Sequence, residues 1–150
     1  MKRIISTVIG FCLVATLHAQ TAEDSVKATI NQLFDGMRNV DSGAIINSFT
    51  DSAILQTIAR SADGKVRVRT DLVSAFATSI AKQTKGALDE QIVFESVKVD
   101  GDLASVWTPY KFYFSGKLSH CGVNSFQLVR VQGAWKIQYL IDTRRRTGCE

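Results

Sequence analysis

Residues 103–143 read LASVWTPYKFYFSGKLSHCGVNSFQLVRVQGAWKIQYLIDT and have the clearest secondary-structure pattern in the chain. β-Branched and aromatic residues alternate with polar ones along three runs. Ser-Gly at 115–116 and Gln-Gly at 132–133 separate these runs as two-residue hairpin turns. A further turn, Asp-Gly-Asp at 100–102, connects them to an earlier apolar run. The pattern therefore predicts four long antiparallel strands, over residues 88–99, 103–114, 118–131 and 134–143.

The residues before this region have the pattern of three helices and two short strands. Thr21 caps a first helix, whose apolar residues recur with a period of 3.6: Val26, Ile30, Leu33, Phe34 and Met37. A second helix begins at the cap Asp41 and includes Ile45, Ile46 and Phe49. Thr70 or Asp71 caps a third helix, which ends near Lys85-Gly86 and turns Leu72, Val73, Phe76 and Ile80 inward. The two strands are expected over residues 53–59 and 65–69.

This order of elements indicates the α+β class, with a curved antiparallel sheet packed against three N-terminal helices. Strands of this length curl, and Pro109 predicts a bend or a bulge. A curled sheet packed against helices forms a cone with a cavity at its wide end. With 150 residues, 45% of them hydrophobic and 21% charged, the chain is not intrinsically disordered and is long enough for one domain.

Residues 1–19 have the pattern of a cleavable signal peptide. Lys2 and Arg3 form a positive segment, an apolar run over 4–17 follows, and Ala19 is the small residue before the cleavage point. The apolar run is too short for a spanning helix, and no later stretch is long and apolar enough to cross a bilayer. We therefore expect a secreted or periplasmic protein whose domain covers residues 20–150. Removal of the signal peptide lowers the formal net charge from +4 to about +2, and a charge this small favours no particular class of partner.

Export changes the interpretation of the cysteines. Cys12 leaves with the signal peptide, so the mature chain keeps Cys121 and Cys149. An even pair in an oxidising compartment predicts a disulfide, although two free thiols are the alternative. Across the last hairpin Cys121 is expected opposite Arg144, from which the tail needs to fold back by only about one turn.

Five segments of the C-terminal half resemble a known family: WTPYKFY at 107–113, GKLSHCG at 116–122, FQLVR at 126–130, WKI at 135–137 and IDTRR at 141–145. The order of elements over residues 20–145 resembles the nuclear transport factor 2-like (SnoaL-like) superfamily, and these segments resemble its lumazine-binding family most. The resemblance implies the cone-shaped fold with its cavity. It implies no single activity, because the superfamily includes isomerase-like and dehydratase enzymes, polyketide cyclases and members that only bind ligands. Lumazine itself is not inferred as the ligand.

His120, the only histidine after residue 19, is the first candidate for a functional site. Strand periodicity places it on one face with Asn124 and Phe126, and pairing across the turn at 115–116 brings Tyr110 beside it. A backbone-satisfied histidine near the rim is the alternative interpretation. The candidate ligand-binding residues are Tyr110, Phe112, His120, Asn124 and Phe126.

The sequence places no catalytic carboxylate in the cavity. Pairing across the turn at 132–133 points Asp142 away from His120 unless a bulge intervenes, so we expect Asp142 to bind Arg144, Arg145 or Thr143 structurally. Asp35 and Asp51 fall outside the predicted core. The chain lacks metal-ligand spacing, a Gly-x-Ser-x-Gly elbow and a phosphate-binding loop, so neither a metal nor a cofactor is expected. The basic run at 144–146 is interpreted as solvated rather than nucleic-acid-binding.

Three functions remain open from the sequence. The first is an exported domain that binds a small, partly aromatic molecule without turnover. The second is an isomerase- or dehydratase-type enzyme that uses His120 and Tyr110. The third is a structural homodimer formed through the outer sheet face by Trp107, Tyr113 and Val129.

Overall fold

The computed structural model describes residues 21–61 and 63–149. The predicted signal peptide over residues 1–19 lies outside this range. None of the described helices has the length and hydropathy needed to cross a membrane.

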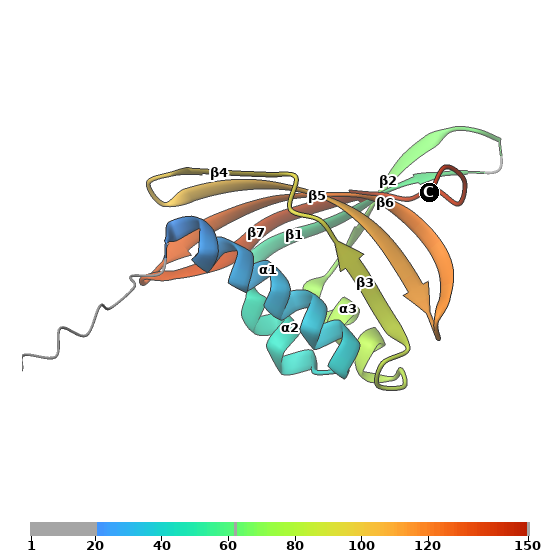
Figure 1. Cartoon of the computed structure of the whole chain (residues 1–150), viewed down its shortest axis with the longest axis horizontal. Helices are drawn as coiled ribbons and strands as arrows, with labels where there is room; N and C mark the ends of the chain where they lie inside the picture. Colours follow the sequence, from blue (N-terminus) through green and yellow to red (C-terminus); the bar gives the residue numbers. More distant parts are fainter. Residues whose placement is uncertain (1–20, 62, 150) are drawn as a thin grey trace, which may run out of the picture.

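The described residues form three helices packed on one face of a curved, open sheet of seven strands (Figure 1). The strand order is β2-β1-β7-β6-β5-β3, and β4 also pairs with β5. The helices are α1 (Ala22–Asn39), α2 (Ser42–Ser48) and α3 (Val73–Ala81). The strands are β1 (Phe49–Arg60), β2 (Val66–Asp71), β3 (Leu88–Ile92), β4 (Ser96–Asp100), β5 (Leu103–Phe114), β6 (Lys117–Val131) and β7 (Ala134–Thr143). The predicted α+β class, with three helices against a curved sheet, is therefore confirmed.

The first helix forms where its apolar period predicts it. Thr21 Oγ1 accepts a hydrogen bond from the Asp24 backbone N–H, and all five predicted stripe residues are buried. Phe34 meets Phe126 edge to face, with ring centroids 6.3 Å apart, so α1 packs directly on the concave face of the sheet.

The third helix differs from its prediction at both ends. Leu72 is its N-cap, no side chain caps it, and the helix ends at Ala81 instead of near Lys85-Gly86. Leu72 is also 73% exposed, so its inward assignment was wrong. Ile80 is buried as predicted, Val73 and Phe76 pack against the core, and Ala77 completes the buried face, following the 3.6-residue period from Val73.

The sheet is mixed, which corrects the expectation of a purely antiparallel one. β1 pairs with β7 in parallel, while the other neighbouring strands are antiparallel. β1 is reached from α2 and not through a hairpin, so no tight turn fixes its direction. The predicted short strand over 53–59 is therefore part of a longer strand inside the sheet, between the edge strand β2 and β7.

The single strand predicted over residues 88–99 is two strands, β3 and β4. The break lies opposite Pro109, whose carbonyl accepts from the Val93 N–H at 3.0 Å, while the Glu95 N–H bonds to Trp107 O at 3.1 Å. Three residues of one strand thus face two of β5, which is a bulge. In an antiparallel sheet the N–H and the C=O of one residue point toward the same neighbouring strand. Pro109 has no N–H to donate toward β3 and β4, so the ladder of hydrogen bonds is interrupted here.

Candidate functional site

A cavity of about 270 Å³ lies between the helices and the concave face of the sheet. Its helical wall is mainly apolar, and its sheet wall carries polar and charged side chains. Apolar residues from α1, α3 and β3 line the cavity: Leu33, Phe34, Met37, Phe76, Ile80 and Leu88. The sheet adds Leu55, Phe112 and Leu140. This combination of a mostly apolar hollow and a few polar groups is typical of small-molecule sites.

One row of polar residues crosses the concave face from β2 to β5. The strand registers align Arg69, Thr57, Asp142, Asn124 and Thr108 as consecutive cross-strand partners. The last four are buried, with exposures of 4%, 6%, 4% and 0%. Buried polar groups usually have hydrogen-bond partners, and Thr108 Oγ1 is the exception among the described residues, since it has none.

Asp142 reaches this row because of a bulge that the sequence pattern did not predict. Asn124 pairs with Asp142 and Gln127 with Tyr139, but Leu128 pairs with Ile137, so Gln138 is an extra residue in β7. The register expected from the turn at 132–133 pointed Asp142 away from the cavity, and that expectation was wrong. Asp142 now lines the same cavity as His120, although no hydrogen bond joins them among the described residues. Arg144 Nε donates to Asp142 Oδ2 at 2.8 Å.

A second distortion at the end of β7 turns Arg144 toward the cavity. The Val123 N–H bonds to the Thr143 side-chain oxygen at 3.1 Å, and the Thr143 carbonyl instead accepts from the Tyr110 hydroxyl at 2.9 Å. The Tyr110 hydroxyl also lies 3.2 Å from Asp142 Oδ2. Burial and the Asp142 charge raise the pKa of Tyr110 above its usual value. Tyr110 is therefore a neutral hydrogen-bond donor that holds Asp142 and Thr143 in place.

Gly122 makes this arrangement possible. A Cβ atom at this position would overlap Thr143 O and lie 2.8 Å from Tyr110 Cε1. We expect Gly122→Ala to lower the free energy of unfolding by about 1–3 kcal/mol, because backbone atoms of β7 must move to admit the methyl group. Chemical denaturation measures this change. Gly43→Ala in α2, where the nearest atom is a side-chain oxygen at 3.3 Å, is the matched control and should not destabilise. An unchanged stability of Gly122→Ala would contradict this packing.

The predicted ligand-binding residues do not all line the cavity. Phe112, His120 and Asn124 do, whereas Phe126 is 0% exposed and belongs to the core against Phe34. Tyr110 is absent from the cavity lining, since its hydroxyl is used within the sheet.

The predicted pairing of Tyr110 with His120 was two residues out of register. Tyr110 pairs with Gly122, and Phe112 pairs with His120. The turn pairs Phe114 with Lys117, which accounts for one position of the difference, and the extra residue Ser119 in β6 accounts for the other. A shift of two residues keeps both side chains on the same face of the sheet, and the ring centroids of Tyr110 and His120 are still only 5.8 Å apart. Burial, followed by the positive charge of Arg144, lowers the pKa of His120, so its imidazole is neutral at pH 7.

Glu90 is a carboxyl group of the cavity that was not predicted from the sequence. Glu90 lies on β3 and lines the cavity, and its Oε1 accepts a hydrogen bond from Asn124 Nδ2 at 2.8 Å. Burial raises the pKa of Glu90 from 4.5 to about 7. The sequence feature that could have revealed Glu90 is its position midway between Leu88 and Ile92. Alternate residues of a strand share a face, so Glu90 lies on the same inward face as these two apolar residues.

The disulfide between Cys121 and Cys149 is present, with Cα atoms 5.6 Å apart. Cys121 is buried on the outer side of β6 and pairs through two backbone hydrogen bonds with Arg145, one residue beyond the expected Arg144. The tail therefore continues the β7 pairing and is locked by the bridge. Among the described residues, no group of His, Cys, Asp or Glu side chains could hold a metal ion.

Comparisons with known proteins identify the fold. No family model and no curated protein sequence matches the chain. A nuclear transport factor 2-like protein of unknown function from Shewanella baltica superposes with a TM-score of 0.65 at 15% identity, covering 82% of this chain and 93% of that one. One from Silicibacter pomeroyi gives 0.62 at 17%, covering 81% and 93%. A domain of unknown function with a cystatin-like fold from Nostoc punctiforme gives 0.65 at 18%, covering 87% and 82%.

These similarities confirm the superfamily resemblance at the level of the fold. The chain has the nuclear transport factor 2-like fold. The finer resemblance to the lumazine-binding family stays a prediction. Identities this low carry no activity from one protein to the other.

Proposed function

We propose that this chain, which has the nuclear transport factor 2-like fold, is an exported domain that binds a small, partly aromatic molecule in the cavity on its concave face. The observation that carries the proposal is Glu90, a carboxyl group placed in a largely apolar cavity with a single side-chain hydrogen-bond partner among the described residues, Asn124. A desolvated carboxyl group is costly to keep, and folding alone does not require it there.

The two faces of the cavity suit the two parts of such a ligand. Phe34, Phe76 and Phe112 offer aromatic contacts to a ring. Glu90 and Asn124 offer hydrogen bonds, because Asn124 donates to only one of the two Glu90 oxygens and its own carbonyl oxygen remains available. A volume of about 270 Å³ limits the ligand to a molecule smaller than a typical drug.

Native mass spectrometry of the protein purified from its own host tests this proposal. We expect a retained small molecule, and we expect Ser79→Trp to abolish its retention. Ser79 lines the cavity from α3 and is exposed, so an indole there fills the cavity without entering the core. Ser74→Trp, on the same helix but away from the cavity, is the matched control and should retain the molecule. Equal retention by the wild type and both variants would contradict binding in this cavity.

A second candidate function is proton transfer on the bound molecule, as in an isomerase or dehydratase. A pKa of about 7 allows Glu90 to accept and release protons at neutral pH. The enzyme hypothesis therefore moves from His120 with Tyr110 to Glu90, because the Tyr110 hydroxyl is engaged with Thr143. Deuterium incorporation into the ligand during incubation in heavy water would support turnover. A ligand that stays unlabelled while bound to the wild type would leave binding as the function.

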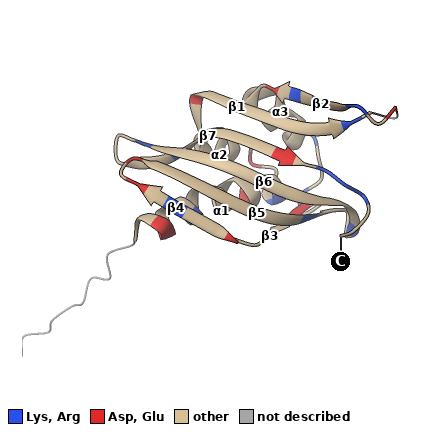
Figure 2. Ribbon diagram, turned by 90° about the horizontal axis from the view of Figure 1, so that it is seen from above, with Lys and Arg blue, Asp and Glu red and all other residues tan. Residues whose placement is uncertain are grey.

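We also propose self-association through the outer sheet face. Trp107, at the middle of β5, is 46% exposed there. Figure 2 shows that Lys, Arg, Asp and Glu lie mostly toward the strand ends and loops around this face. A dimer mass that Trp107→Ser reduces to that of one chain would support this assembly, and a single-chain wild type would contradict it.

A further inference from the structure

Two arginines at the edge of the cavity are held in the same way. Arg69 Nε donates to Asp71 Oδ2 at 3.0 Å, and Arg144 Nε donates to Asp142 Oδ2 at 2.8 Å. In each pair the acid lies two residues from the arginine along the chain. All four residues line the cavity. The carboxylates thus engage the inner nitrogen of each guanidinium group and leave its terminal nitrogens toward the cavity edge.

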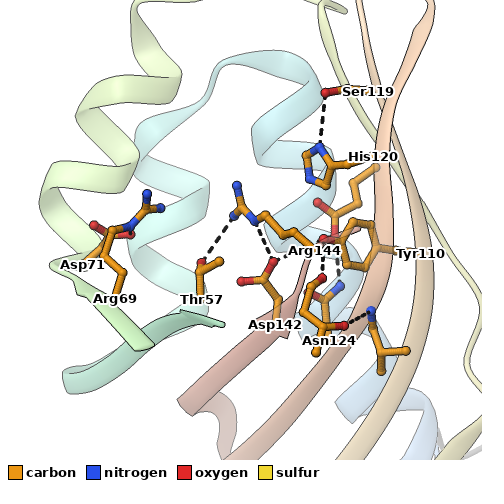
Figure 3. Close-up of polar contacts among 12 residues, drawn as sticks. Thr57, Arg69, Asp71, Tyr110, Ser119, His120, Asn124, Asp142 and Arg144 are labelled. Carbon is orange, nitrogen blue, oxygen red and sulfur yellow. Dashed lines mark hydrogen bonds and ion pairs between the residues drawn. The ribbon is translucent and has the colours of Figure 1, made fainter. Parts of the chain in front are cut away.

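Thr57 lies between the two arginines. It is the cross-strand partner of Arg69 on β2 and of Asp142 on β7, and its Oγ1 lies 3.4 Å from Arg144 Nη2. Figure 3 shows the two guanidinium groups on either side of Thr57. Within the described part of the chain, the terminal nitrogens of Arg69 and Nη1 of Arg144 have no hydrogen-bond partner. Their side chains are 61% and 46% exposed, so a ligand can reach them.

On the basis of the function proposed above, we infer that the ligand is a small ring-containing carboxylic acid, with its carboxylate between Arg69 and Arg144 and its ring in the apolar part of the cavity. The planar guanidinium fork matches the geometry of a carboxylate, and charge-assisted hydrogen bonds of this kind are stronger than neutral ones. Because their inner nitrogens are already anchored, both forks are oriented before the ligand arrives.

The unpaired guanidinium N–H groups at this edge favour an anion over a cation. Asp71 Oδ2 and Asp142 Oδ2 accept from the two Nε atoms, and the terminal guanidinium nitrogens that remain are N–H donors for an anion. Glu90, whose surroundings include Asn124, Tyr110, Asp142 and Arg144, has a pKa of about 7 and is largely uncharged at pH 6. Binding of an anion is therefore best measured at pH 6.

Three probes of similar shape and different charge test this inference on the disulfide-bonded protein: benzoate, benzamide and benzylamine. At pH 6 we expect benzoate to bind about tenfold to hundredfold more tightly than benzamide, and benzylamine most weakly, as followed by backbone amide shifts in NMR titrations. Arg69→Gln should remove the preference for benzoate and leave benzamide affinity unchanged. Arg67→Gln, two residues along β2 and outside the cavity lining, is the matched control and should keep the preference.

The outcomes separate this inference from the proposed function. Equal affinity for benzoate and benzamide, or a benzoate preference that survives Arg69→Gln, would overturn the carboxylate inference while leaving small-molecule binding in place. Tighter binding of benzylamine would reverse the assigned charge of the ligand and also overturn it. If none of the probes shifts a cavity residue and no host molecule is retained, both proposals fail together.

Discussion

Glu90→Gln is expected to raise the free energy of unfolding at pH 8 by about 3 kcal/mol relative to the wild type. The folded-state pKa of Glu90 is about 7, against an ordinary value of 4.5, because the carboxyl group is buried. Each unit of pKa difference corresponds to about 1.4 kcal/mol. Glutamine resembles the protonated carboxyl group and can still accept the hydrogen bond from Asn124 Nδ2, so it removes the cost of ionisation without removing this contact.

The sign of the pH dependence follows from proton binding. Between pH 4.5 and 7 the folded state keeps the Glu90 proton, while the unfolded state releases it. The contribution of Glu90 to stability is therefore full below pH 4.5 and is lost as the pH rises to 7. Denaturation of wild type and variant at a series of pH values should give curves that coincide near pH 4 and separate up to pH 8.

Glu95→Gln is the matched control for this experiment. Glu95 lies five residues further along the chain and is exposed, so the same change of charge there should leave the difference from wild type close to zero at both ends of the pH range. Parallel curves for Glu90→Gln and wild type across the whole range would show that the Glu90 carboxyl group is solvated in the folded protein.

Loss of the Cys121–Cys149 disulfide is expected to lower the stability by about 3.5 kcal/mol. The bridge closes a loop with a sequence separation of 28, and in the chain-entropy model the cross-link restricts the unfolded chain to this extent. Cys149→Ser is the preferred variant, because Cys121 is buried and its replacement would also disturb packing against the tail. Denaturant titrations of the oxidised wild type and of Cys149→Ser measure the loss.

Reduced wild-type protein is the control, and its stability should match that of Cys149→Ser. Wild-type protein recovered from the periplasm or the medium without reductant should show no reactive thiol, which also tests the proposed export. Two free thiols per mature chain in that material would rule out the bridge in its native compartment.

The sequence predicted those elements whose signals are local. The apolar period of α1 and the cap at Thr21 place that helix. The two-residue turns place the bounds of β5 and β7. Their backbones at Ser115-Gly116 and Gln132-Gly133 have the positive φ angles that two-residue hairpin turns require. In each case the information lies within a few residues of the element that it determines.

The candidate site was harder to predict because it depends on register across several strands. The extra residue Gln138 turns Asp142 to the concave face, and the extra residue Ser119 shifts His120 by one position relative to β5, from Lys111 to Phe112. Neither residue differs in type from an ordinary strand residue, so alternation alone did not reveal the bulges. The position of Glu90 could not be predicted either, because it depends on the break between β3 and β4 opposite Pro109. The pairing of β3 with β5 then places Glu90 within hydrogen-bond distance of Asn124.

The position of β7 has a consequence for how the chain is made. The last strand in the sequence lies between β1 and β6, so the sheet cannot be completed before residue 143 has left the ribosome. Until then β1 has no neighbouring strand on the side where β7 pairs. Pairings this distant in sequence form slowly. The complete fold therefore forms only after β7 has been synthesised, so a chain with the proposed signal peptide could begin to cross a membrane before it is fully folded.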